Sequence, residues 1–289
     1  MKDALPKISV ICTCFNHERY VTESMESVLS QTYKNYELIV VDDGSADESP
    51  TVIEKFQKQH PEITFLKLEK NEGICKAFNT ALKICSGDFI IDLAADDVLL
   101  PERLARGVKI FETLDDGYGV IFGDAEWIDA QGKRLCFHSE KHPHNSIPQG
   151  NIYHPLIEHY FICSPTMMFR RSVIEALGGY DETLSYEDFD FWIRSSRIFK
   201  YHYEPLVLVK KRKLKNSLSQ SQFKVFNKHN YTTYKVCAKI LDLNRTVKEQ
   251  HALRKRIQYE IRQTIRTLDI SLTYKYCLLW AKNNSRQYL

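Results

Sequence analysis

Acidic side chains gather at three places in this 289-residue chain. Two of them are carboxylate pairs, Asp42-Asp43 and Asp96-Asp97, and each pair closely follows a short run of mainly apolar residues. The third is Glu187-Asp188, with Asp190 two positions further on. Two carboxylate pairs suit a hard divalent cation that bridges a diphosphate, because Mg²⁺ keeps several waters and uses one or two protein carboxylates. We therefore expect a phosphate-bearing ligand held together with a cation.

The runs that precede the two pairs predict strands. Ile8–Thr13, Glu37–Val41 and Phe89–Leu93 are typical of strands buried on both faces, which is the pattern of a parallel sheet. Ligands of open α/β sheets bind outside the carboxyl ends of the strands, so both pairs are expected at one rim. A simpler alternative is a helix N-cap, a role that fits Asp43 and Asp97 well. Two pairs after two buried strands, with a third acidic group downstream, favour the binding interpretation.

Helical patterns alternate with these strands along the first half of the chain. Helices are expected at Glu18–Gln31, from a capping box at Ser45–Glu48 through Lys58, at Ile74–Cys85 and from Pro101 onward. A further strand is expected at Thr64–Leu68. This order predicts an α/β fold with a mostly parallel, doubly wound sheet and helices on both faces.

The second half of the chain is less regular. We expect a strand at Gly119–Phe122, a hairpin at Asp124–Arg134, an apolar segment at Phe161–Phe169, and helices at Ser172–Leu177 and Tyr186–Phe199. The polar segment His138–His154 predicts a mobile loop near the site. After Tyr231 the chain is expected to be helical, with one apolar stripe of Leu253, Ile257, Ile261, Ile265, Leu268 and Leu272. We divide the chain into a catalytic domain, residues 1–220, and a basic helical C-terminal extension, residues 221–289.

The net charge of +3 conceals an uneven distribution. Residues 197–289 carry 21 Lys/Arg and 5 Asp/Glu, which leaves residues 1–196 with 19 Lys/Arg and 32 Asp/Glu. The basic region is either solvated or docked on the acidic part, or it attracts anionic lipid headgroups or anionic substrates. The basic run Lys210–Lys213 lacks interleaved aromatic residues, so a phosphate or membrane role is favoured over nucleic acid.

Composition and cysteine usage indicate an ordinary globular protein, with 43% hydrophobic and 27% charged residues. No run of about 18 uncharged apolar residues occurs, so no membrane-spanning helix is expected, and the N-terminus has no apolar signal core. The eight cysteines occur singly, as is typical of buried thiols in a reducing cytosol, and His142, His144 and His154 are spaced too irregularly to favour zinc. We expect a cytoplasmic location, with peripheral attachment to the inner face of the cell membrane as an open alternative.

A set of motifs gives the chain a specific resemblance to a known family. The motifs are Ile8-Ser-Val-Ile-x-Thr-x-Phe-Asn16, Ser27-Val-Leu-Ser-Gln-Thr32, Glu37-Leu-Ile-Val-Val-Asp-Asp-Gly-Ser-x-Asp47, Asn71-Glu-Gly73 through Ala77, Phe78 and Asn79, Gly87-Asp-Phe-Ile, Asp96-Asp97, Phe169-Arg-Arg, Gly178-Gly-Tyr-Asp-Glu182 and Tyr186-Glu-Asp-Phe-Asp-Phe-Trp192. In this order, over residues 7–220, the set resembles the family 2 glycosyltransferases, which are inverting enzymes with a GT-A fold. The resemblance implies transfer of a sugar from a nucleotide-diphosphate donor, a UDP-sugar first of all, to a hydroxyl of a growing, lipid-linked glycan. It also implies a divalent metal, Mn²⁺ or Mg²⁺, as cofactor.

The resemblance also implies roles for individual residues on the donor side. Thr13 and Phe15 would line the pocket for the base, Asp42 would hydrogen-bond the base or ribose, Asn71 and Ala77 would close the nucleoside pocket, Asp96 would contact the ribose side, and Asp97 would hold the metal on the diphosphate.

On the acceptor side, Asp188 occupies the general-base position, Glu187 and Asp190 would support it, and Trp192 would pack beneath. An inverting transfer needs a carboxylate to take the proton of the attacking hydroxyl and a cation to carry the charge on the leaving diphosphate. We therefore expect Asp97 and Asp188 on opposite sides of the transferred sugar. The alternative for the second group is a solvated helix start, where acids interact favourably with the helix dipole.

Two positions depart from the family pattern. Ala94 stands where the family commonly has the first acid of Asp-x-Asp-Asp, and Asp92 is expected to be out of register with it. Leu214 stands where many members have a His that reaches the metal or diphosphate, so Lys213 or Lys215 would neutralise the diphosphate instead.

Two other functions are alternatives to glycosyl transfer. A nucleotidyltransferase would need a glycine-rich phosphate loop after the first strand, and Thr13–Asn16 contains no glycine. A nucleotide-sugar-binding or scaffold protein without turnover would account for Ala94 and Leu214, but not for the retained Asp97 and Asp188.

Overall fold

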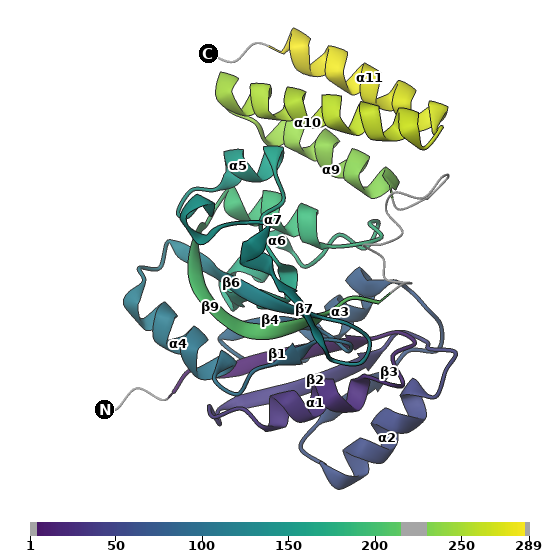
Figure 1. The fold of residues 1–289 in the computed structure, drawn as a ribbon, viewed down its shortest axis with the longest axis vertical. Coiled ribbons are helices and arrows are strands. Elements are labelled where there is room, and N and C mark those ends of the chain that lie inside the picture. The colour runs from purple at the N-terminus through teal and green to yellow at the C-terminus, as the bar shows by residue number, and fades with distance from the viewer. Residues whose placement is uncertain (1–4, 215–229, 287–289) are drawn as a thin grey trace.

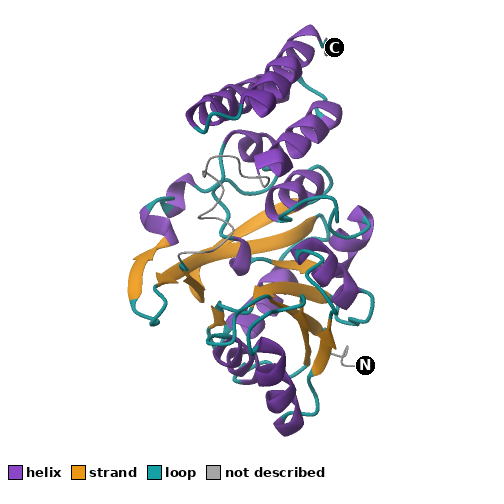
Figure 2. Cartoon of the chain, turned by 90° about the vertical axis from the view of Figure 1, so that its right-hand side faces the viewer, coloured by secondary structure: helices purple, strands orange, loops and turns teal. Residues whose placement is uncertain are grey.

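The computed structural model describes residues 5–214 and 230–286. Within them one nine-stranded sheet has the order β3-β2-β1-β4-β8-β6-β9-β5, with β7 paired to β6. Helices cover both faces of the sheet, and three C-terminal helices stack at the end of the molecule away from β1 to β3 (Figures 1 and 2). The predicted α/β architecture with a C-terminal helical part is confirmed.

The first half of the chain forms the parallel part of the sheet. Its strands are β1 (Ile8–Cys14), β2 (Tyr36–Asp42), β3 (Thr64–Lys67) and β4 (Phe89–Ala94), and β1 pairs in parallel with β2 and β4, as β2 does with β3. The helices between them are α1 (Val21–Leu29), α2 (Ser49–Gln59) and α3 (Ile74–Leu82). All carboxyl ends of these strands therefore lie at one edge, as the sequence predicts.

The second half contributes strands of both directions. These are β5 (Val98–Leu99), β6 (Tyr118–Ile128), β7 (Arg134–Phe137), β8 (Met168–Arg170) and β9 (Lys200–Arg212). Strand β8 is antiparallel to β4 and β6, whereas β9 is parallel to β6 and antiparallel to β5. Strand β6 and β7 form the predicted hairpin. Because Lys210 pairs with Val98, the end of β9 lies beside the turn that follows β4.

Further helices complete the two layers. They are α4 (Arg103–Thr113), α5 (Tyr153–Glu158), α6 (Arg171–Leu177) and α7 (Asp188–Ser196), with short 3₁₀ turns at His138–Glu140, His144–Ser146 and Ser164–Thr166. Gly178 ends α6 in the left-handed conformation, with φ of 69°, as predicted for a glycine at that position.

Strand alternation divides the core between the two faces of the sheet. In β1, Val10 and Cys12 pack with Met25 of α1 on one face, and Ile11 packs with Phe78 of α3 on the other. The first core also takes in α2 and α4, and the second also takes in α6, α7 and the C-terminal helices.

The C-terminal helices share a core with the sheet. They are α9 (Asn230–Leu243), α10 (Val247–Arg266) and α11 (Ile270–Ser285). Cys237, Leu253 and Tyr276 are fully buried in the same apolar cluster as Phe189 and Trp192 of α7. The division predicted after residue 220 lies outside the described residues, so it stays a prediction.

The predicted apolar stripe through Leu272 is wrong in its second half. Helix α10 ends at Arg266, and Leu272 belongs to α11. Ile265 and Leu268 are 57% and 67% exposed instead of buried. The chain reverses at Leu268, which has a positive φ of 56°. No glycine or proline marks this turn in the sequence, so the pattern gave no signal for it.

Several helix starts also differ from the sequence predictions. The capping box at Ser45–Glu48 is absent, because α2 has its N-cap at Glu48 with no side-chain cap. Ser45 Oγ donates to Asp42 at 2.5 Å instead. Helices α1 and α7 are shorter than predicted at both ends, and α4 begins at Arg103, after the turn at Pro101.

Candidate active site

The Asp42-Asp43 pair builds the rim at the carboxyl end of β2. Asp42 is fully buried and accepts hydrogen bonds from the backbone N–H and hydroxyl of Ser45. Asp43, 4% exposed, accepts from the backbone N–H groups of Glu72 and Gly73 at 2.8 and 2.9 Å. Both carboxylates therefore hold the loops that surround the rim. Direct contact between Asp42 and a nucleoside stays a prediction.

The other residues predicted for the nucleoside pocket lie at different depths. Thr13 is 7% exposed near the end of β1, and the ring of Phe15 beyond it is 41% exposed. Asn71 is exposed in the loop fastened by Asp43. Ala77 is fully buried in α3 and belongs to the core. Thr13, Phe15 and Asn71 thus lie near the carboxyl edge of β1 and β2, whereas Ala77 packs in the core and has no surface open to a ligand.

Asp97 is held in place by the end of β9. Its Oδ1 accepts from the backbone N–H of Arg212 at 2.8 Å, and the residue is 3% exposed. Burial, together with the neighbouring Asp96, raises the pKa of Asp97 to about 8. A cation bound here would favour the charged form, because its own charge dominates the local field.

The side chain of Arg212 also holds the Asp96-Asp97 turn. The sequence did not predict this role, because Arg212 is one of several cations in a basic run. Its side chain is 2% exposed, and its guanidinium donates to the backbone oxygen of Asp96 at 2.9 Å and to Glu23 at 2.5 Å. The guanidinium also lies over the ring of Tyr20, 4.7 Å from its centroid. Arg212 therefore fixes the turn that carries both carboxylates.

Lys211 is the cationic side chain that faces the acidic groups. It lies over the ring of Trp127 at 5.2 Å. Burial disfavours its charged form, but the titratable groups around it, Cys163, Asp97 and Asp188 first among them, raise the pKa of Lys211 overall. The sequence pointed to Lys213 or Lys215 for this role; Lys213 is exposed, and Lys215 lies outside the described residues.

Glu187 and Asp188 begin helix α7 and form the second acidic group. Glu187 Oε2 and Asp188 Oδ1 are buried atoms without a hydrogen-bond partner among the described residues. Burial, Asp188 and Asp92 together raise the pKa of Glu187 well above its usual range. Glu187 thus favours its protonated form beside Asp188, which keeps an acceptor oxygen free.

Asp92 belongs to the same acidic group, and it lies two residues before Ala94 in β4, so it does not stand in the position of Ala94. Strand residues two apart point to the same face, so Asp92 lies on the face of Ala94, one step further into the sheet. Its Oδ2 accepts from the hydroxyl of Tyr180 at 3.0 Å. Burial and the charge of Asp188 raise the pKa of Asp92 to about 7.

Tyr180 is positioned by Asn79 of α3. The side chain of Asn79 donates to the backbone oxygen of Tyr180 and accepts from its N–H, each at 2.9 Å. A Cβ on Gly179, whose φ is 91°, would lie 2.8 Å from Asn79 Oδ1, so the close approach requires glycine. Two motifs distant in the sequence thereby set the partner of Asp92.

Asp190 and Trp192 connect α7 to neighbouring parts of the chain. Asp190 is 1% exposed and pairs with Arg194 at 2.7 Å and with Lys239 of α9 at 2.5 Å. Trp192 donates from its indole nitrogen to Met167 Sδ at 3.2 Å. Asp190 therefore anchors the helix to the C-terminal helices and is not part of the open carboxylate group.

The donor set fits a cation that is shared with a ligand. Among the described residues, no group of three or more His, Cys, Asp or Glu side chains is arranged to hold a metal ion. Asp96 and Asp97 could supply one or two oxygens, and a diphosphate and water would supply the rest, which is how Mg²⁺ is usually bound. Across that same described part, His142, His144 and His154 form no zinc group.

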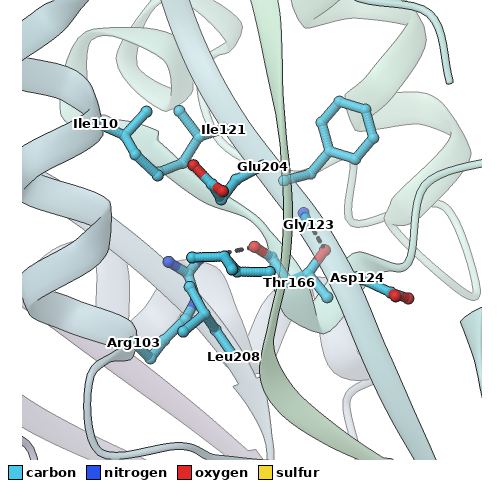
Figure 3. A pocket seen from close by; sticks show the side chains of 10 residues that line it. Arg103, Ile110, Ile121, Gly123, Asp124, Thr166, Glu204 and Leu208 are labelled. Atoms are coloured by element: carbon cyan, nitrogen blue, oxygen red, sulfur yellow. Dashed lines mark hydrogen bonds between the residues drawn. The ribbon is translucent and has the colours of Figure 1, made fainter. Parts of the chain in front are cut away.

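A separate pocket lies between α4, β6 and β9 (Figure 3). Arg103, 2% exposed, donates to the backbone oxygen of Thr166 at 2.7 Å, and Thr166 Oγ1 accepts from the N–H of Gly123 at 3.0 Å. Burial lowers the pKa of Arg103 to about 10. No residue predicted for the site lines this pocket. Arg103 thus ties the chain around Thr166 to α4, apart from the acidic rim.

Comparison with known proteins identifies the family. The model for "Glycosyl transferase family 2" matches residues 9–178. An uncharacterized glycosyltransferase of Rickettsia prowazekii is 31% identical over 215 residues, covering 72% of this chain and 64% of that protein. One from Methanocaldococcus jannaschii is 32% identical over 192 residues, covering 65% and 64%. The chain thus spans 64% of the length of each relative. It belongs to glycosyl transferase family 2, as its motifs predicted.

Solved structures share the fold. TarS of S. aureus, in complex with UDP-GlcNAc, has a TM-score of 0.66 at 21% identity, covering 96% of this chain and 79% of its own. The mannosyltransferase PcManGT from Pyrobaculum calidifontis, in complex with GDP-Man and Mn²⁺, has a TM-score of 0.67 at 16% identity, covering 99% and 77%. The GT-A-like fold predicted from the sequence is confirmed.

The raised pKa of Asp92 predicts a pH-dependent stability. Its pKa is about 7 in the folded chain against 3.8 ordinarily, so the folded state binds the extra proton between these values and loses stability as the pH rises through them. Asp92→Asn keeps an acceptor for Tyr180 and removes the buried charge. The variant should exceed the wild type by about 1–3 kcal/mol in urea unfolding at about pH 8 and match it at about pH 4.

Asp116→Asn is the control for this measurement, because the side chain of Asp116 is fully exposed. It should leave the pH profile unchanged. A destabilisation of Asp92→Asn that is equal at both pH values would contradict the assigned titration.

Proposed function

We propose that this chain is an inverting glycosyltransferase that moves a sugar from a nucleoside-diphosphate donor to an acceptor hydroxyl. The observation that carries the proposal is the pair of acidic groups around Lys211. Asp97 lies in the turn between β4 and β5, and Asp188 lies at the start of α7 with a buried oxygen that has no hydrogen-bond partner among the described residues. The group with Asp97 and Lys211 could bind an anionic leaving group, and the free oxygen of Asp188 could accept the proton of a hydroxyl.

In the proposed reaction, Asp188 takes the proton of the acceptor hydroxyl as its oxygen attacks the anomeric carbon. The bond between that carbon and the diphosphate oxygen breaks, and the diphosphate leaves with the electron pair. Lys211 neutralises part of the charge that develops on it. A divalent cation at Asp97, when bound, would act as a Lewis acid on the same phosphates. Glu187, which favours its protonated form, would limit the repulsion on Asp188.

We propose a UDP-sugar as the donor. The support is the fold shared with TarS, which has been solved with UDP and with UDP-GlcNAc. PcManGT has been solved with GDP-Man and Mn²⁺, which supports a divalent cation and makes GDP the competing base. The exposed ring of Phe15 and the nearby Thr13 would contact the base, and Asn71 would lie beside the nucleoside.

The acceptor we propose is a hydroxyl of a growing, lipid-linked glycan at the cytoplasmic face of a membrane. The surplus of positive charge in the C-terminal part supports this location, because anionic headgroups attract clustered Lys and Arg side chains. A binding or scaffold protein without turnover is the competing function, favoured only by Ala94 and Leu214.

A panel of UDP, GDP, CDP and TDP, with and without Mn²⁺, tests the donor site by thermal unfolding. UDP with Mn²⁺ should raise the melting temperature of the wild type, since ligand at about a hundredfold its Kd stabilises by about 2.7 kcal/mol. Asp97→Asn should lose the part of this rise in melting temperature that depends on Mn²⁺, and Asp116→Asn should show the full rise. If no nucleotide stabilises the folded wild type, the assignment of the donor site is wrong and the scaffold function is favoured.

Lys211→Met tests the neutralisation of the diphosphate. The variant should bind UDP about tenfold more weakly by titration calorimetry, while uridine binds it as it binds the wild type, because only the phosphates lose a partner. Lys213→Met is the matched control, two residues away on an exposed side chain. Equal losses in both variants, or an equal loss for uridine, would contradict the role of Lys211.

A further inference from the structure

The outward face of α11 is apolar. Ile270, Tyr274 and Leu278 follow one another at intervals of four residues, so they lie on one side of the helix. They are 82%, 64% and 54% exposed. The opposite side packs Leu272 and Tyr276 into the core. Helix α11 therefore has two apolar faces, one buried in the core and one exposed.

The turn between α10 and α11 extends this apolar surface. Ile265 is 57% exposed and Leu268 is 67% exposed. Leu268 has a φ of 56°, a backbone conformation that is uncommon for residues other than glycine, and its side chain nevertheless faces solvent. Together with Ile270 these residues form an exposed apolar tip; in Figure 1 the hairpin lies at the end of the molecule opposite β1 to β3.

Exposed cations lie near both ends of the apolar surface. Arg262 and Arg266 are exposed in the last turns of α10, and Lys282 is exposed on α11. Residues 230–286 carry 12 Lys/Arg and 4 Asp/Glu. Two of those acids are committed within the protein: Glu249 pairs with Arg197, and Asp269 caps α11 by accepting from the N–H of Leu272. The unbalanced charge on this part is positive.

We propose that the α10–α11 hairpin docks on an anionic membrane surface. The stripe and tip, defined as Ile265, Leu268, Ile270, Tyr274 and Leu278, would enter the boundary between headgroups and acyl chains. The flanking cations Arg262, Arg266 and Lys282 would lie at the lipid phosphates. Apolar area combined with attraction to anionic lipids is the basis of such interfacial binding.

Charge decides between a membrane and a second copy of the chain. Two copies joined through this face would bring two positively charged helical parts together, which like-charge repulsion opposes. An anionic lipid surface complements the same charges. Within residues 5–214 and 230–286, no helix is long and apolar enough to cross a membrane. This inference rests on the membrane location proposed above and names the surface that makes the contact, and its test needs no donor.

The experiment is co-sedimentation of the full chain with lipid vesicles. Binding to vesicles with about 30% phosphatidylglycerol in phosphatidylcholine should be at least about tenfold stronger than to phosphatidylcholine alone. It should weaken as salt is raised from about 0.1 M to about 0.5 M, because screening shortens the reach of the cations.

Ile270→Gln with Leu278→Gln should weaken vesicle binding by about tenfold or more, since two inserted side chains are lost. Both positions are exposed, so the melting temperature should not change. The matched control is Ile84→Gln with Ile198→Gln, at positions 50% and 60% exposed on the rest of the chain. The control should bind vesicles as the wild type does.

Three results would overturn the proposal. These are an absence of binding to anionic vesicles, an equal loss in the control variant, or a wild-type dimer in sedimentation velocity that the double variant abolishes while vesicles are not bound. Nucleotide binding, measured on the same samples, separates this failure from a failure of the donor site.

Discussion

The site depends on compensating the negative charge of carboxylates that are crowded together and poorly solvated at one rim of the sheet. Burial and mutual repulsion raise the pKa values of Asp92, Asp97 and Glu187, so these groups resist carrying charge together. Strand β9 supplies the compensating positive charge, because its last residues place Lys211 among the acids and Arg212 on the Asp96-Asp97 turn. It reaches that turn only because it runs along β6 and ends beside β5.

The C-terminal helices take part in the same balance. Lys239 of α9 pairs with Asp190 and Asp181, and Lys255 of α10 pairs with Glu158. Part of the basic charge therefore docks on the acidic part of the chain, which was one of the two interpretations that the charge distribution left open. The exposed cations Arg262, Arg266 and Lys282 form no ion pair among the described residues, and they support the membrane proposal.

Strands and their carboxyl ends could be predicted from the sequence, because buried β-branched runs and turn residues are local patterns. Lys211 could not, because three consecutive cations end β9 and only the register, shifted by irregularities between β6 and β9, decides which one faces the rim. The role of Ser45 was missed because its hydroxyl bonds Asp42 in place of a helix end. The α10–α11 turn lacks the glycine or proline that would mark it.

Asp188→Asn tests the central claim most directly. With the nucleotide sugar as donor and water as acceptor, the release of nucleoside diphosphate should fall by at least about a hundredfold, since removing a general base commonly costs that much. The Kd for the nucleoside diphosphate should stay within about twofold of the wild type, because the proposed function assigns Asp188 to the acceptor side. Release near the wild-type rate would contradict the account, as would a loss explained entirely by weaker donor binding.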